Sequence, residues 1–214
     1  MGVAVLVVGD SGCGKSASLR NFETDEVGIL NVEGKPLPFK KKLKMADNAG
    51  YDLIEQTLKA NNLHAYVIDD AGYLLQNENI DRALEVGYVK YTDMAQHFKK
   101  KVIDAARYTD KDTIVYIFMH IQRDAAGHEK PMTVGRLLDE KVCIEGEFTI
   151  VLRAAVVDGQ HVFLTKSDGY TCAKAPIDML PDVMDNDLKQ VDTLIREYWD
   201  MAPLAKEKKT KNKE

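Results

Sequence analysis

The chain opens on Val3-Ala4-Val5-Leu6-Val7-Val8-Gly9-Asp10-Ser11-Gly12-Cys13-Gly14-Lys15-Ser16, an apolar run followed by a glycine-rich segment that ends in a lysine and a serine. Residues 9–16 match G-x-x-x-x-G-K-[ST] at every defined position, and the run before them is typical of a buried strand. Glycines let the backbone curl so that successive N–H groups and a helix N-terminus face one anion. The pattern therefore predicts a strand, a phosphate-binding loop and a helix.

The residue types in this loop suit a nucleoside triphosphate with its magnesium ion. We expect Lys15 to reach the β- and γ-phosphates and Ser16 to give its hydroxyl to Mg²⁺. A glycine-rich turn that merely precedes a helix is the plain structural alternative. The residues predicted to bind the nucleotide are Gly9, Asp10, Ser11, Gly12, Cys13, Gly14, Lys15 and Ser16.

Composition narrows the class of protein. A chain of 214 residues is long enough for one well-buried domain. The net charge of −5 argues against a generally basic nucleic-acid-binding protein, so such contacts must come from local patches. Three widely spaced cysteines indicate reduced thiols in the cytoplasm, and the opening strand leaves no room for a signal peptide. No apolar stretch approaches the ~20 residues of a membrane span, so no membrane partner is expected.

Beyond the loop, apolar runs alternate with segments of helical period. This alternation predicts an α/β fold with a mainly parallel central sheet and helices on both faces. The predicted strands are 27–32, 64–68 and 113–119, and the predicted helices are 51–59 and 85–108.

The pattern changes in the last third of the chain. Residues 147–175 show no helical period and contain Asp158-Gly159 between two strand-like runs, which predicts a β-hairpin extension. Residues 186–200 have the period of a closing amphipathic helix, with Asp185 as a candidate cap. We therefore expect a core domain over residues 1–202 and a disordered lysine-rich tail over 203–214.

Polar residues follow three of the predicted strands at the edge where ligands bind in parallel sheets. Asp69 is placed to hold Mg²⁺, whereas Asp70 should point elsewhere by strand alternation, either orienting water or facing solvent. Glu33 could orient the attacking water, and His120 could sense the γ-phosphate. Each also has a structural reading, as a turn cap, a strand exit or an ordinary histidine.

Three lysine-rich segments stand out on this acidic chain, at residues 40–42, 99–101 and 206–213. Each could be a solvated surface. Together they favour non-specific, salt-sensitive contact with the backbone of single-stranded DNA.

In their order along the chain, these segments resemble the RecA-type ATPase core. They are more closely similar to short phage-encoded nucleotide-binding proteins that include Sak-type single-strand annealing ATPases. The resemblance covers most of residues 1–200. The matching segments are residues 9–16, Asn31-Val32-Glu33-Gly34, Val67-Ile68-Asp69-Asp70, Phe118-Met119-His120, Glu145-Gly146-Glu147-Phe148, Val151-Leu152-Arg153-Ala154 and Thr171-Cys172-Ala173-Lys174.

This resemblance implies a RecA-like P-loop NTPase that uses ATP and Mg²⁺, with Glu33 and His120 as catalytic and sensing residues. It implies a homo-oligomer with ATP at the subunit interface, where Lys174 reaches the neighbour's nucleotide. It also implies action on single-stranded DNA in annealing or recombination, with recombination or replication proteins as further partners. The corresponding DNA-binding loop, Gln122 to Val134, lacks the aromatic residues that stack on bases.

Two other classes of protein remain open from the sequence. A small-molecule phosphotransferase would need arginines that clamp the transferred phosphoryl group, and the nearby candidates are Arg123 and Arg136. A non-catalytic, nucleotide-dependent assembly module of a recombination or replication complex would bind ATP without hydrolysing it. Turnover measurements separate these classes from an ATPase.

Overall fold

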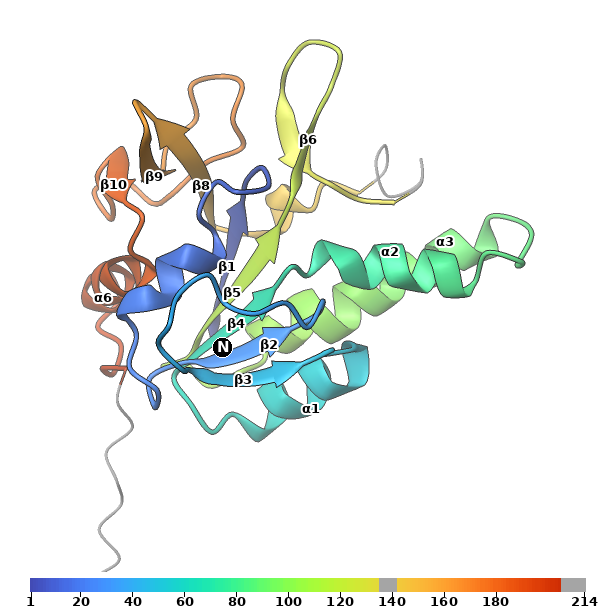
Figure 1. Ribbon diagram of the computed structural model, residues 1–214, viewed down its shortest axis with the longest axis horizontal. Coiled ribbons are helices and arrows are strands. Elements are labelled where there is room, and N and C mark those ends of the chain that lie inside the picture. Colours follow the sequence, from blue (N-terminus) through green and yellow to red (C-terminus); the bar gives the residue numbers. More distant parts are fainter. Residues whose placement is uncertain (135–141, 205–214) are drawn as a thin grey trace, which may run out of the picture.

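The computed structural model describes residues 1–134 and 142–204. Its centre is an eight-stranded sheet with the order β10-β9-β8-β1-β5-β4-β2-β3 (Figure 1). The six strands from β8 to β3 pair in parallel, and β9 and β10 add antiparallel pairs at one edge. The strands are β1 (Val3–Val8), β2 (Gly28–Asn31), β3 (Lys44–Asp47), β4 (Ala65–Asp69), β5 (Ile114–Met119), β8 (Ile150–Val157), β9 (Gln160–Leu164) and β10 (Val183–Asp185).

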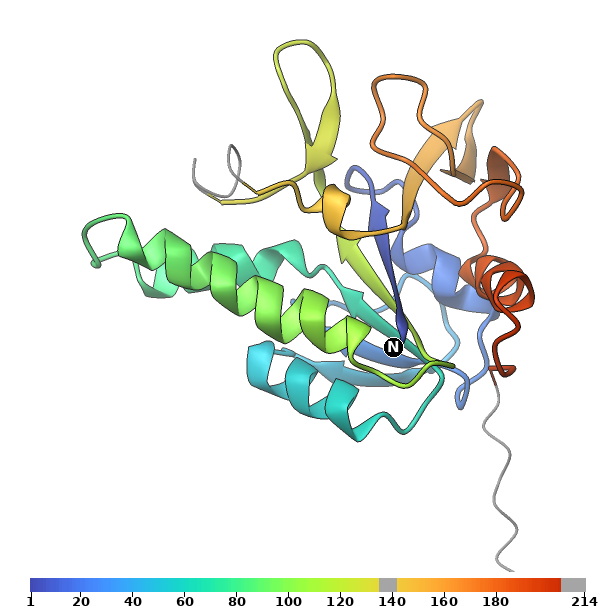
Figure 2. The ribbon, with the colours of Figure 1, turned by 180° about the vertical axis from the view of Figure 1, so that it is seen from behind.

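Helices cover both faces of this sheet, as the sequence predicts. One face carries α1 (Tyr51–Ala60), α2 (Gly72–Asp81) and a long helix made of α3 (Val89–Phe98), a π-helical segment η2 (Lys99–Asp104) and α4 (Ala105–Arg107), which Figure 2 shows from behind. The other face carries the 3₁₀ helix η1 (Ser16–Asn21) and α6 (Leu188–Tyr198).

Each central strand contributes side chains to both hydrophobic cores, one on each face of the sheet. In β1, Leu6 and Val8 join the core beneath α1 and α3, whereas Val5 and Val7 join the core beneath η1 and α6. All four side chains are fully buried, which explains why the strand reads as a continuous apolar run. The prediction of an α/β fold with a mainly parallel sheet is confirmed, and the arrangement is consistent with a P-loop-like fold.

The predicted hairpin forms, but as part of the main sheet. Asp158 and Gly159 have φ values of +51° and +77°, as a two-residue turn between twisted strands requires. Strand β8 then pairs in parallel with β1, so the hairpin continues the core sheet. A second small hairpin, β6 (Ile121–Arg123) with β7 (Glu129–Pro131), rises from the carboxyl edge (Figure 1).

Two boundaries at the C-terminal end differ from those that the sequence predicts. Asp185 ends β10, and Asp187 caps α6 instead, accepting hydrogen bonds from the backbone N–H groups of the helix's first turn. Pro203 and Leu204, predicted to begin the tail, are packed: the Pro203 carbonyl lies 2.8 Å from His64 Nδ1, and Leu204 is buried. The rest of the predicted tail lies outside the described residues. Within the described part of the chain, no helix is long and apolar enough to cross a membrane.

Candidate functional site

A pocket of about 450 Å³ lies at the carboxyl edge of the sheet, where the loop after β1 meets the ends of β5, β4 and β2. The predicted site residues that line it are Ser11, Gly12, Gly14, Lys15, Ser16, Asp69 and His120. Gly9, Asp10 and Cys13, also predicted to bind the nucleotide, are not among the lining residues. The sheet thus gathers residues from segments that are far apart in the sequence.

The loop itself has the backbone that its glycines allow. Gly12 and Gly14 have φ values of +75° and +100°, in the left-handed region that a side chain would strain. Lys15 is only 6% exposed, and its Nζ donates hydrogen bonds to the carbonyls of Gly9 (2.9 Å) and Asp10 (3.1 Å). Burial lowers the pKa of Lys15 from its usual value. The ammonium therefore lies inside the curl of the loop, beside the pocket.

Ser16 and Asp69 meet although they are 53 residues apart in the sequence. Ser16 Oγ donates to Asp69 Oδ1 at 3.1 Å. Magnesium usually takes one or two protein oxygens together with water and phosphate oxygens, so this pair fits it. Burial, assisted by the nearby Asp70, raises the pKa of Asp69 to about 6, as expected for a carboxylate with little compensating charge.

His120 connects the two sides of the pocket because β5 lies between β1 and β4. Its Nδ1 is 3.4 Å from Lys15 Nζ, and its Nε2 is 3.5 Å from Asp70 Oδ1. Since an ammonium only donates, Nδ1 acts as the acceptor, and we infer that Nε2 carries the ring proton toward Asp70. The imidazole is therefore in contact with the residue predicted to hold phosphate and with a carboxylate.

Asp70 lines the pocket, so the expectation that it points elsewhere is wrong. Strand alternation ends at Asp69, and Asp70 has a left-handed backbone with φ of +62°. Its Oδ2 accepts from Lys35 Nζ at 3.1 Å. Burial acts to raise the pKa of Asp70, but hydrogen bonds from His120 and Lys35 outweigh it, and the pKa is lowered. An anionic carboxylate thus faces the pocket beside His120.

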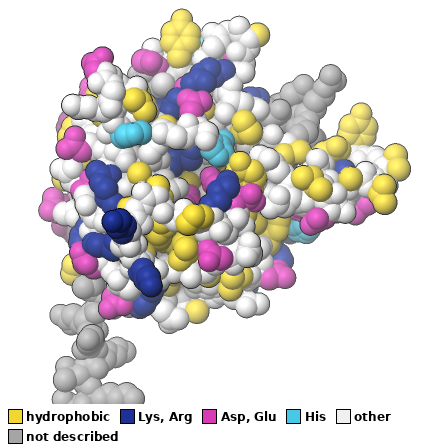
Figure 3. Space-filling view, in the orientation of Figure 1, with side chains coloured by type: hydrophobic (Ala, Val, Ile, Leu, Met, Phe, Trp, Pro, Cys, Tyr) yellow, Lys and Arg dark blue, Asp and Glu magenta, His cyan; other side chains and the backbone are white. Residues whose placement is uncertain are grey.

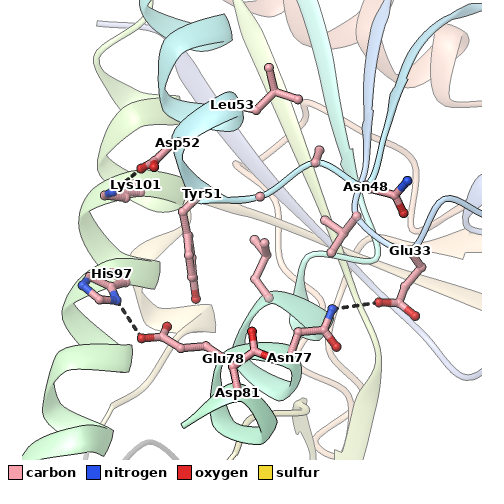
Figure 4. Close-up of a pocket in the computed structure, with 14 residues that line it drawn as sticks. Glu33, Asn48, Tyr51, Asp52, Leu53, Asn77, Glu78, Asp81, His97 and Lys101 are labelled. Atoms are coloured by element: carbon pink, nitrogen blue, oxygen red, sulfur yellow. Dashed lines mark hydrogen bonds and ion pairs between the residues drawn. The ribbon is translucent and has the colours of Figure 1, made fainter.

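The structure does not bring Glu33 into this pocket. Strand β2 ends at Asn31, which lines the phosphate-loop pocket, and the chain then turns Glu33 into a separate pocket of about 700 Å³. There Glu33 Oε1 accepts from Asn77 Nδ2 at 3.1 Å, and Tyr51 and Glu78 line the same space (Figure 4). The assignment of Glu33 as the water-orienting residue stays a prediction.

The remaining predicted residues lie away from the pocket. Lys174 forms an isolated bridge with Val151 through two backbone hydrogen bonds of 2.8 and 2.9 Å, so its action on a neighbour's nucleotide stays a prediction. Arg123 is held by Asp10 at 3.1 Å and by Glu129 at 2.7 Å. Arg136, the other arginine considered for a phosphotransferase, lies outside the described residues.

Two residues beside the loop carry no roles in the sequence predictions. Arg153 on β8 is 6% exposed and bonds Asp10 at 2.8 Å and Glu129 at 2.7 Å, which ties the phosphate loop to the β6–β7 hairpin. His161 on β9 lines the pocket, with its Nδ1 3.0 Å from the Cys13 carbonyl. Arg153 and His161 contact loop residues that are more than 140 positions away in the sequence, and Arg153 also contacts Glu129 in the β6–β7 hairpin. No local sequence pattern therefore indicates these contacts.

The chain matches no protein-family model and no curated protein. Its function is therefore inferred from the geometry at this edge of the sheet. That geometry consists of a glycine-rich loop after a central strand, a buried lysine, and a serine hydroxyl paired with a carboxylate from a distant strand.

Proposed function

We propose that this protein is a RecA-like ATPase of the phage type, which binds and hydrolyses MgATP and acts on single-stranded DNA in annealing or recombination. One observation carries the ATP part of the proposal. Ser16 Oγ and Asp69 Oδ1 meet at 3.1 Å beside the buried Lys15, at the mouth of a loop with the phosphate-binding pattern. A glycine-rich turn with only a structural role does not require this meeting of distant polar groups.

In this proposal each residue of the pocket has a task that follows from its position. The loop N–H groups and Lys15 hold the phosphates, and Ser16 and Asp69 hold Mg²⁺, which when bound neutralises charge on the phosphate oxygens. His120 reports the presence of the γ-phosphate, because it touches Lys15 on one side and Asp70 on the other. A carboxylate then orients the attacking water.

Glu33 and Asp70 are the two candidates for the carboxylate that orients the attacking water. Glu33 is the residue implied by the resemblance, but it must leave Asn77 to reach the phosphates. Asp70 already lines the pocket and is held by Lys35 and His120. The geometry favours Asp70 as the water-orienting residue.

The DNA part of the proposal rests on the resemblance and on one basic segment. Lys40 and Lys42 are exposed and follow Pro38, which lines the pocket. Basic side chains gather on the lower left of the face shown in Figure 3, where the loop between β2 and β3 runs in Figure 1. Ion pairs engage Lys41 with Glu23, Lys99 with Asp104 and Lys101 with Asp52. We therefore assign DNA contact to Lys40 and Lys42, which follow the pocket-lining Pro38.

The experiment is ATP turnover measured without DNA, with single-stranded DNA and with duplex DNA. A several-fold rise specific to single strands is expected, and Lys42→Glu should reduce that rise. The matched control is Lys111→Glu, because Lys111 is an exposed lysine before β5, at the opposite edge of the sheet. ATP binding without hydrolysis under all three conditions would instead support the assembly module. Phosphoryl transfer to a small acceptor would support a phosphotransferase.

A further inference from the structure

The sheet order gives the phosphate-loop pocket two distinct ends. Strands β5 and β4 lie on one side of β1, and β8 and β9 lie on the other. His120 and Asp69, at the ends of β5 and β4, form the end of the pocket to which Lys15 Nζ turns. His161 on β9 forms the opposite end. A triphosphate with its last phosphate beside Lys15 therefore leaves the rest of the ligand nearer to His161.

His161 lies directly against the phosphate loop. A Cβ atom on Gly14 would come within 2.9 Å of His161 Nδ1, so only glycine allows the ring to approach this closely. The ring is exposed, and its Nδ1 contacts the Cys13 carbonyl at 3.0 Å. An aromatic face is thus held at the edge of the pocket by a fixed contact with the loop.

A second polar group lies at the same glycine. Atoms of the Asn186 amide would be 3.1 and 3.2 Å from a Gly14 Cβ, and Asn186 is 3% exposed. Arg20 Nη1 donates to Asn186 Oδ1 at 3.4 Å. Because a guanidinium only donates, this contact assigns the amide oxygen to that position and the amide nitrogen Nδ2 to the other. That buried nitrogen makes no hydrogen bond within the described residues. Asn186 does not line the pocket, so it packs behind the loop and is not itself a contact for the ligand.

We propose that the β9 end of the pocket, formed by His161 with Asn186 behind it, binds the nucleoside of the nucleotide. The imidazole face stacks on the base. This inference rests on the proposed function, because it concerns the same pocket. It adds that the protein recognises a nucleotide through its base, beyond the phosphates alone.

The experiment compares ATP with inorganic tripolyphosphate, which carries the phosphates without a nucleoside. Both are titrated with Mg²⁺ into wild-type protein, His161→Ala and His161→Phe by calorimetry. Because stacking of one base on an aromatic side chain contributes about 1–3 kcal/mol, His161→Ala should weaken ATP binding by a factor of about 5 to 150. Tripolyphosphate affinity should stay within about twofold, and His161→Phe, which keeps an aromatic face, should retain most of the ATP affinity.

The matched control is His128→Ala, since His128 is an exposed histidine on the loop of the β6–β7 hairpin that does not line the pocket. Unchanged ATP affinity in His161→Ala would overturn the inference and leave the proposed function intact. So would an equal loss for both ligands, because His161 would then serve the loop or the phosphates. Wild-type protein that binds neither ligand would overturn the proposed function and this inference with it.

Discussion

Two clusters of buried charge lie at opposite edges of the same sheet, and they differ in how their partners are supplied. At the carboxyl edge are Lys15 and Asp69, and at the amino edge are Asp192 and Arg196, all at most 7% exposed. Burying charge is costly unless partners compensate for it. The source of that compensation separates a structural cluster from a candidate binding site.

At the amino edge, other groups of the protein supply the hydrogen-bond and ion-pair partners of Asp192 and Arg196. Asp192 accepts from Tyr116 Oη at 2.9 Å and from Arg196 Nε. Arg196 also donates to the carbonyls of Asp112 and Ala202 through Nη1 and to the carbonyl of His64 through Nη2. Since His64 and Asp112 precede β4 and β5, these bonds fasten α6 to the sheet. The cluster needs no ligand.

At the carboxyl edge, the protein supplies fewer partners to the buried charges of Lys15 and Asp69. Lys15 donates to two loop carbonyls and contacts His120, and Asp69 accepts from one hydroxyl, while both residues line a pocket. Burial raises the pKa of Asp69 to about 6 and also raises the pKa of Asp192, so what distinguishes the two clusters is the pocket beside Asp69. Buried charges that face a cavity are typical of sites where a ligand supplies the missing interactions. We therefore infer that the amino-edge cluster stabilises the fold, and binding at the carboxyl edge stays our proposal.

The largest effect is expected when the amino-edge cluster is broken. Arg196→Ala leaves Asp192 buried without its charged partner, which should lower the free energy of unfolding by about 3–5 kcal/mol. Urea denaturation measures the loss. The nucleotide affinity of the folded protein should not change. Because paired apolar replacement avoids the stranded charge, the double variant Asp192→Leu/Arg196→Met should lose less. A loss below about 1 kcal/mol in Arg196→Ala would place this pair among weak surface-like ion pairs and contradict the comparison.

A smaller effect should separate the two carboxylates near the pocket. Asp70→Asn should lower the ATP turnover number about 100-fold, the low end of what a general base contributes, with ATP affinity retained. Glu33→Gln is the matched variant and should lose much less, because Glu33 lies in the pocket around Asn77. Single-turnover kinetics measure both. If Glu33→Gln lost most of its turnover and Asp70→Asn did not, the role implied by the resemblance would be the right one.

Local sequence patterns predicted much of the fold and several residues that the structure brings together in the candidate site. The phosphate loop is one continuous segment, and Asp69 follows a strand that reads as apolar, so Lys15, Ser16 and Asp69 could be identified before their meeting was seen. The short strands β3 and β10 were not predicted, because edge strands of three or four partly exposed residues carry little pattern. Helix α2 was also not predicted, since its buried residues are confined to its first turn.

The direction of individual side chains was harder to predict. Asp70 turns into the pocket through a left-handed backbone, and Glu33 turns away because the chain bends after Asn31. Arg153 and His161 reach the loop through sheet pairing of β8 with β1 and of β9 with β8. The places of Arg153 and His161 depend on pairing between strands that are far apart in the sequence, and those of Asp70 and Glu33 depend on turns after the strands; a single sequence displays neither.

The most direct test of the central claim is calorimetric titration of MgATP into wild-type protein and two lysine variants. Lys15 and Lys90 are 6% and 7% exposed, but only Lys15 lines the pocket, so Lys90→Ala is the matched control. We predict saturable binding by wild-type protein and by Lys90→Ala. Lys15→Ala should show no detectable binding, with its melting temperature retained. ATP affinity that is unchanged in Lys15→Ala would contradict the account.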